Sequence, residues 1–162
     1  MKTFRIEPIG KDVDVRTAST VVSALLAQGN GQVKQICGGK GLCATCHIKI
    51  GAGHDALSPL GQREKRTLSL LSGADGDSRL GCQAKILGNG VVVQLPDGIY
   101  LESLAQLDAL VGRRAEEPLR HPLTGMVLVS AGKIITRSTV NVLRNLDLDV
   151  VEMLKRSDDA AM

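Results

Sequence analysis

Four cysteines constrain this chain more than any other feature of its 162 residues. Three lie close together and the fourth follows much later, in the spacing C-x5-C-x2-C-x35-C at Cys37, Cys43, Cys46 and Cys82. The N-terminus carries no charged segment followed by an apolar one, as an export signal would, so we expect a cytoplasmic location with reduced thiols rather than two structural disulfides. The cysteines are therefore expected to bind a metal centre.

The spacing favours a [2Fe–2S] cluster over a single zinc ion. A structural zinc site usually takes two short cysteine pairs, and only Cys43 and Cys46 form such a pair here. A [2Fe–2S] cluster carries concentrated negative charge that many backbone N–H groups must meet, and glycines let the backbone approach the sulfurs. Three ligands from one glycine-rich loop plus one remote ligand is the plant-type ferredoxin arrangement, apart from one extra residue in the first gap. Zinc and a bare thiol redox site remain the alternatives.

The sequence from Cys37 to His47, Cys-Gly-Gly-Lys-Gly-Leu-Cys-Ala-Thr-Cys-His, resembles the adrenodoxin-type [2Fe–2S] ferredoxins. That family has a five-residue first gap and a histidine after the third cysteine. The similarity continues through Leu57-Ser58-Pro59 and residues 78–83 to residues 91–96, so it covers about residues 1–98. It implies a β-grasp fold and a soluble one-electron carrier that works between a ferredoxin reductase and redox acceptor proteins.

The resemblance also implies individual roles in the site. By this similarity Cys37 and Cys43 hold the iron nearer the surface, and Cys46 and Cys82 hold the more buried one. Thr45 adds a hydroxyl and a backbone donor beside the cluster. By analogy with plant-type clusters the reduction potential is expected to be low, on the order of −400 mV.

Local patterns independently predict an α+β domain with a mixed sheet over residues 1–98. Alternating apolar and polar residues at 3–8 and 12–16 predict an antiparallel hairpin. The other expected elements are a helix from Ser19 or Thr20 to about Gln28, a strand at 47–50, a helix from Ser58-Pro59 to about Leu71, and a second hairpin joining 84–87 to 91–95 around Gly88-Asn89-Gly90.

Residues 99–162 are expected to form a small α/β extension, which the adrenodoxin-like carriers lack. The pattern predicts a helix over 101–111, a linker over 112–122, and then a unit of two short strands and a helix over 126–145. Such a segment buries too little apolar surface to fold securely alone. We therefore expect it to pack on a second copy of the chain in a homodimer, with packing on its own first domain as the alternative.

Composition and charge exclude several classes of function. The only aromatic residues are one Phe and one Tyr, so no set of base-stacking platforms for nucleic acid exists. No apolar stretch approaches the roughly 18 residues of a membrane span. We also expect no catalytic site and hence no enzyme.

The net charge is +3, with 12 basic and 8 acidic residues in 1–98. The basic segment 63–66 stands where the family has an acidic docking helix, so it is expected either to face an acidic partner or to be a solvated surface.

Two other functions remain open at this stage. One is a redox sensor or interaction module in which the cluster state changes how residues 99–162 dock. The other is an electron-transfer subunit dedicated to one oxidoreductase, with the extension as its anchor. His47 next to a ligand is compatible with a Rieske-like ligand role, although four cysteines favour a structural imidazole hydrogen-bonded within the domain.

Overall fold

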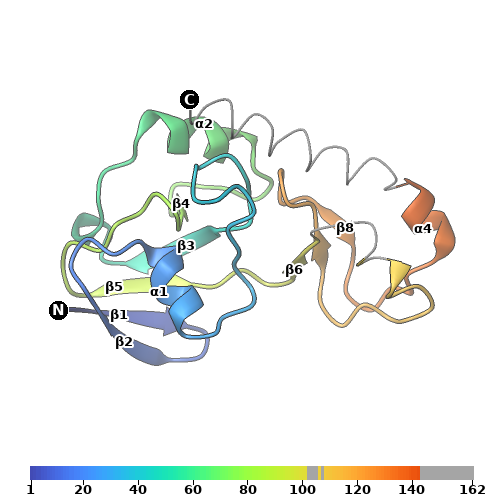
Figure 1. Cartoon of the computed structure of the whole chain (residues 1–162), viewed down its shortest axis with the longest axis horizontal. Coiled ribbons are helices and arrows are strands. Elements are labelled where there is room, and N and C mark those ends of the chain that lie inside the picture. Colours follow the sequence, from blue (N-terminus) through green and yellow to red (C-terminus); the bar gives the residue numbers. More distant parts are fainter. Residues whose placement is uncertain (102–105, 107, 143–162) are drawn as a thin grey trace.

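The computed structural model describes residues 1–101, 106 and 108–142. A larger unit holds the first five strands, and a smaller one follows it in the chain (Figure 1). The elements are β1 (Lys2–Glu7), β2 (Lys11–Val15), α1 (Val21–Ala27), β3 (His47–Ala52), the 3-10 turn η1 (His54–Ala56), α2 (Gln62–Leu70), β4 (Ser78–Leu80), β5 (Val91–Gln94), β6 (Ile99–Tyr100), β7 (Leu119–Arg120), β8 (Val127–Val129) and α4 (Arg137–Val142). No helix within the described residues is both long enough and apolar enough to cross a bilayer.

The larger unit is built on a five-stranded mixed sheet in the order β2-β1-β5-β3-β4. Strand β1 pairs antiparallel with β2 and parallel with β5, and β3 pairs antiparallel with β5 and β4. Alternate residues of these strands point to one face and bury their apolar side chains there, as in Phe4, Ile6, Val91 and Val93. The first hairpin is confirmed, and the mixed sheet with α1 packed against it is the expected β-grasp architecture.

Helix α1 begins and ends where its sequence predicts. The Thr20 side chain accepts a hydrogen bond from the Ser23 N–H at 3.3 Å and caps the N-terminus. Gly29, with a φ of 73°, follows the last turn, where a left-handed residue commonly stops a helix. Val21, Val22, Ala24 and Leu25 of α1 are buried and form part of the main core, whereas Leu26 is 41% exposed.

The expected start of the second helix at Ser58-Pro59 is wrong, because α2 begins at Gln62. Ser58 is used instead to hold a distant segment: its backbone N–H donates to the Lys85 carbonyl, and its hydroxyl accepts from the Lys85 N–H, both at 2.9 Å. A local capping signal is thus overridden by a pairing between residues far apart in the sequence.

The expected hairpin around Gly88-Asn89-Gly90 is also wrong. Strand β5 pairs with β1 and β3 on its two sides, so both of its edges are occupied. The preceding segment instead makes isolated bridges, Lys85 with Thr20 and Ile86 with Leu57. The turn residues are present as predicted, but the strand that follows them lies in the middle of the sheet.

The extension forms a second, three-stranded sheet in the order β6-β7-β8. Strand β7 lies inside the segment 112–122 that was expected to be a linker, while β8 and α4 fall close to their predicted positions. Ile134 makes only an isolated bridge, to Arg114. Of the helix expected at 101–111, residues 102–105 and 107 lie outside the described residues. A small core of its own holds this part together, made of Leu101, Ala115, Leu119, Val129 and Ile135.

The two units are joined at β6. Tyr100 is 2% exposed and belongs to the main core, whereas the next residue, Leu101, belongs to the core of the extension. Arg120 of β7 reaches back to Asp97, pairing with its carboxylate at 2.7 Å and donating to its carbonyl at 3.1 Å. The chain therefore enters the extension without a free linker.

Tyr100 gives a direct test of this junction, because it is the only tyrosine and the chain has no tryptophan. Burial raises the pKa of Tyr100 to about 12, compared with about 10 for an unfolded tyrosine. The unfolded state therefore loses its proton first, and stability falls by about 1.4 kcal/mol per pH unit between these two values. We expect phenolate absorbance to appear with a midpoint near 12 in the folded protein and near 10 in denaturant. A folded-state midpoint near 10 would contradict the burial of Tyr100, and Tyr100→Phe supplies the blank.

Candidate functional site

The four cysteines meet at one place. Cys37, Cys43 and Cys46 lie in the loop between α1 and β3, and Cys82 follows β4 by two residues. All four are buried, with exposed fractions of 3%, 0%, 1% and 8%, and all are free thiols. The Cys37 side chain is within hydrogen-bond reach of Cys43 and Cys82, and that of Cys46 reaches Cys82. The structure thus brings together the residues that the spacing singles out.

Backbone N–H groups are directed at the sulfur of Cys37. Its pKa lies below the usual value because the thiolate accepts hydrogen bonds from the thiols of Cys43 and Cys82 and from the N–H groups of Leu42 and Lys40. These two N–H donors come from the glycine-rich loop itself. A thiolate is the form of cysteine that binds a metal.

The sulfur of Cys46 has a similar environment. Its pKa is also lowered, because it accepts from the Cys82 thiol and from the backbone N–H groups of Cys82 and Gly81. Two segments of chain, the loop and the turn after β4, therefore both supply donors to sulfur. This donor set suits an anionic iron–sulfur cluster, whose sulfurs need many such bonds.

Thr45 connects the two ends of the loop. Its hydroxyl lies 3.0 Å from the Cys43 Sγ, accepts from the Ile36 N–H at 3.3 Å and donates to the Lys34 carbonyl at 3.1 Å. Its carbonyl accepts from the Lys34 N–H at 2.7 Å. Thr45 is fully buried. The hydroxyl beside the site agrees with the role that the family resemblance implies.

Two side chains from outside the loop hold its glycine-rich tip. The Gln83 Nε2 donates to the Gly39 carbonyl at 3.0 Å and lies 3.4 Å from the Cys82 Sγ. The Thr67 hydroxyl of α2 donates to the Gly41 carbonyl. Gly41 has a φ of 71°, and a Cβ there would lie 3.1 Å from the Gln83 side chain. Sequence reasoning missed both supports, because no local pattern links Thr67 to a residue 26 positions away.

A buried ion pair ties α2 to the strand that leads to Cys82. Arg79 donates two hydrogen bonds to the Glu64 carboxylate, at 2.7 and 3.1 Å, and the Leu80 N–H donates to the same carboxylate at 2.9 Å. Glu64 is 1% exposed. In the sequence Glu64 is one of four consecutive charged residues, and nothing there distinguishes it from its solvated neighbours.

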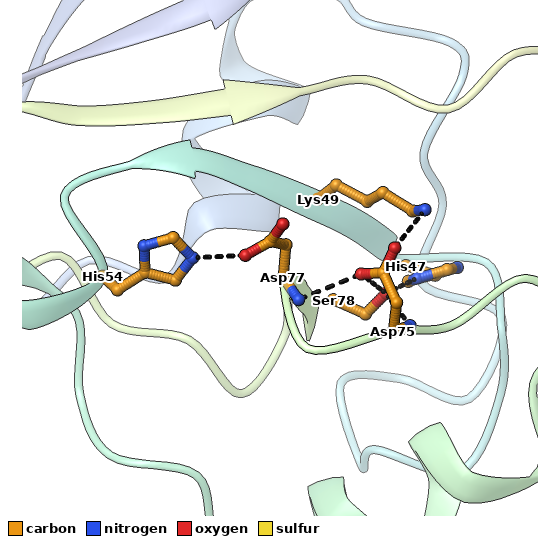
Figure 2. Close-up of polar contacts among 6 residues, drawn as sticks. All are labelled: His47, Lys49, His54, Asp75, Asp77 and Ser78. Atoms are coloured by element: carbon orange, nitrogen blue, oxygen red, sulfur yellow. Dashed lines mark hydrogen bonds and ion pairs between the residues drawn. The ribbon is translucent and has the colours of Figure 1, made fainter.

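The His47 side chain is hydrogen-bonded within the domain. Its Nε2 lies 2.8 Å from the Ser78 Oγ, and burial lowers its pKa to about 4, so the imidazole is neutral at pH 7. This agrees with the structural interpretation of His47 over the Rieske-like one. Figure 2 shows the polar network around it, in which Asp75 accepts from Lys49 at 2.7 Å. The network ties β3 to the turn before β4 and to the start of β4.

The donor set fits a dinuclear cluster better than a single ion. The cysteine contacts follow one another from Cys43 to Cys37, Cys82 and Cys46. A cluster with two irons takes two sulfurs at each, so its ligands are spread in this way.

Comparison with known proteins points to iron–sulfur ferredoxins. Residues 4–87 match the family described as the 2Fe-2S iron-sulfur cluster binding domain. The 2Fe-2S ferredoxin of Pseudomonas aeruginosa is 30% identical over 89 residues, which cover 55% of this chain and 79% of the relative. The 2Fe-2S ferredoxin-5 of Aquifex aeolicus is 38% identical over 77 residues, covering 46% of this chain and 79% of the relative.

Solved structures show the same fold. The ISC-like [2Fe-2S] ferredoxin FdxB of Pseudomonas putida superposes with a TM-score of 0.54 at 25% identity, covering 59% of this chain and 93% of its own. A putidaredoxin chain in a covalent complex of putidaredoxin reductase and putidaredoxin gives a TM-score of 0.50 at 25% identity, covering 58% of this chain and 95% of its own. The family match ends at residue 87, ahead of the extension.

The buried ion pair leads to a prediction about stability. Glu64→Ala leaves the Arg79 guanidinium buried without its partner, so we expect the free energy of unfolding to fall by about 3–5 kcal/mol. Lys65→Ala, at the exposed neighbouring position, should change it by less than about 0.5 kcal/mol. Chemical denaturation followed by circular dichroism measures both. Equal stability of the two variants would show that the pair is dispensable.

Proposed function

This chain belongs to the 2Fe-2S iron-sulfur cluster binding domain family and carries electrons on a [2Fe–2S] cluster, and we propose that it transfers them singly from a ferredoxin reductase to acceptor proteins. One observation supports the proposal above others: four buried free thiols from two separate segments meet where backbone N–H groups already point at sulfur. We propose Cys37, Cys43, Cys46 and Cys82 as the cluster ligands. The protein itself is proposed to catalyse no reaction.

The roles of the surrounding residues follow from what such a site requires. When bound, the cluster accepts and releases one electron. The N–H groups of Lys40, Leu42 and Gly81 offset the negative charge at the sulfurs. Thr67 and Gln83 hold the loop in the conformation that presents those donors. A rigid site of this kind needs little rearrangement when its charge changes, which favours fast transfer.

The surface next to the loop supports an acidic protein partner. Helix α2 exposes Arg63, Lys65 and Arg66, whereas Glu64, its only acidic residue, is buried against Arg79. The Arg63 guanidinium donates to the Lys40 carbonyl at 3.3 Å, so the basic face adjoins the loop that encloses the site. A basic surface beside the cluster would steer an acidic reductase or acceptor to the position where the transfer distance is short.

Other parts of the proposal concern the setting of the protein. Among solved structures, the covalent complex of putidaredoxin with its reductase supports a reductase as one partner. The free thiols agree with a reducing, cytoplasmic compartment. Exposed apolar residues of the extension, Met126, Val127 and Ile134, offer a small surface for the homodimer, which stays a prediction.

The proposed cofactor predicts a defined composition. The purified chain should hold two irons and two acid-labile sulfides, with visible absorbance that dithionite bleaches and air restores. Cys82→Ser should lose most of the cluster, because the sequence holds no fifth cysteine to replace it. Iron and sulfide analysis with absorbance spectra measures both. Stoichiometric zinc without labile sulfide would overturn the proposal, and reduction by a panel of purified reductases tests the carrier function itself.

The basic face predicts a change in transfer rate. Arg63→Glu combined with Lys65→Glu should slow reduction by a reductase about tenfold at low salt and flatten its salt dependence, because favourable steering becomes repulsion. Lys11→Glu with Arg16→Glu changes the net charge equally at exposed positions of the far edge of the sheet and is the matched control. Stopped-flow measurements at several ionic strengths compare the two. Equal reduction rates for the two double variants would show that the basic face of α2 is only a solvated surface.

A further inference from the structure

The extension touches the cluster site through one short loop. Residues 121–125, between β7 and β8, lie against the cysteine loop and against the end of α2. The Ala44 N–H, between two of the cysteines, donates to the Pro122 carbonyl at 2.8 Å, and the Ser72 N–H donates to the Thr124 carbonyl at 2.8 Å. Pro122 is buried. A backbone donor inside the cysteine motif is thus satisfied by the extension.

The side chain of Leu123 makes the second contact. It packs on the buried pair Cys37 and Cys43, together with Ile36 and Leu42 of the cysteine loop. No other residue of the described extension joins this apolar group. Leu123 therefore packs over two of the four cysteines.

Several bonds hold the loop in this position. Arg120 donates to the Gly125 carbonyl at 2.9 Å while its other arm pairs with Asp97. The Leu123 N–H donates to the His121 Nδ1 at 3.1 Å, and the Gly125 N–H donates to the His121 carbonyl at 2.8 Å. Gly125 is buried with a φ of 71°, and a Cβ there would lie 3.6 Å from the Ala44 Cβ. The loop 121–125 therefore packs closely on the cysteine loop and is held in place by its own hydrogen bonds.

From these contacts we propose that the loop 121–125 is an additional wall of the cluster site, in which Pro122 and Leu123 are positioning residues that exclude water and hold the reduction potential down. The inference rests on the proposed function, since it requires a cluster at the four cysteines. The second unit of the chain thereby sets a property of the first.

The direction of the effect follows from charge. A cluster with four thiolate ligands is anionic and gains a further negative charge on reduction. Water or an added polar group stabilises the more highly charged form, so opening the site raises the potential. The hydrogen bond from the Ala44 N–H to the Pro122 carbonyl also fixes the backbone of the cysteine loop. Without this bond the Ala44 N–H becomes free to turn toward the sulfurs or to exchange with solvent.

The experiment compares three variants of the full chain. Leu123→Ser removes the apolar cover, Leu123→Met keeps it, and Met126→Ser makes a comparable change at an exposed position nearby that does not join the group around Cys37 and Cys43. We expect Leu123→Ser to have a higher potential than the parent, to lose iron to a chelator several-fold faster and to exchange its Ala44 amide proton faster. The other two variants should match the parent in all three measurements.

The outcomes separate this inference from the function beneath it. A parent chain that binds no cluster overturns the proposed function. If the Leu123→Ser variant binds the cluster but keeps the parent's reduction potential and iron-release rate, only the proposed role of the loop 121–125 is overturned. If the variant loses helical and sheet signal in circular dichroism, Gly125→Ala serves as the second variant. It strains the same loop through the positive φ without changing any apolar side chain, and an unchanged potential there also overturns the cover.

Discussion

The burial of four sulfur atoms, two of them within reach of backbone N–H donors, is the constraint on which the rest of this structure depends. A thiolate out of water is costly unless hydrogen bonds or metal compensate its charge. Helices and strands use their own N–H groups internally, so the donors must come from irregular backbone. The loop before β3 and the turn at Gly81 provide it, and the surrounding elements hold those two segments together.

The Glu64–Arg79 pair shows how this holding is done. Placing a carboxylate at 1% exposure is unfavourable by itself, but two bonds from Arg79 and one from the Leu80 N–H satisfy its oxygens. The pair fixes α2 to β4, and Thr67 one turn further along α2 fixes the loop tip. The same helix thus braces both segments that carry the cysteines, while its exposed side remains available for a charged partner.

The extension adds a third support that is independent of the sheet. Its own core is small, and Tyr100 and Arg120 anchor it to the larger unit at the point where the chain leaves β5. A loop anchored in this way can pack an apolar side chain on the cysteine loop without ordering a long linker. The neighbouring contacts already compensate the conformational entropy lost when the loop is ordered. The second unit therefore belongs to the site through proximity to the cysteine loop rather than through any motif of its own.

The sequence by itself determined the chemistry and much of the local structure. Cysteine spacing and glycine content predicted the [2Fe–2S] cofactor, and alternation and capping signals located β1, β2 and α1, because these depend on residues close together in the chain. Only the tertiary structure decided that β5 lies between β1 and β3, that Ser58 binds Lys85 rather than capping a helix, and that Leu123 reaches Cys37 and Cys43. Each of these contacts joins segments far apart in sequence, where burial and hydrogen-bond satisfaction in the whole fold outweigh local preference.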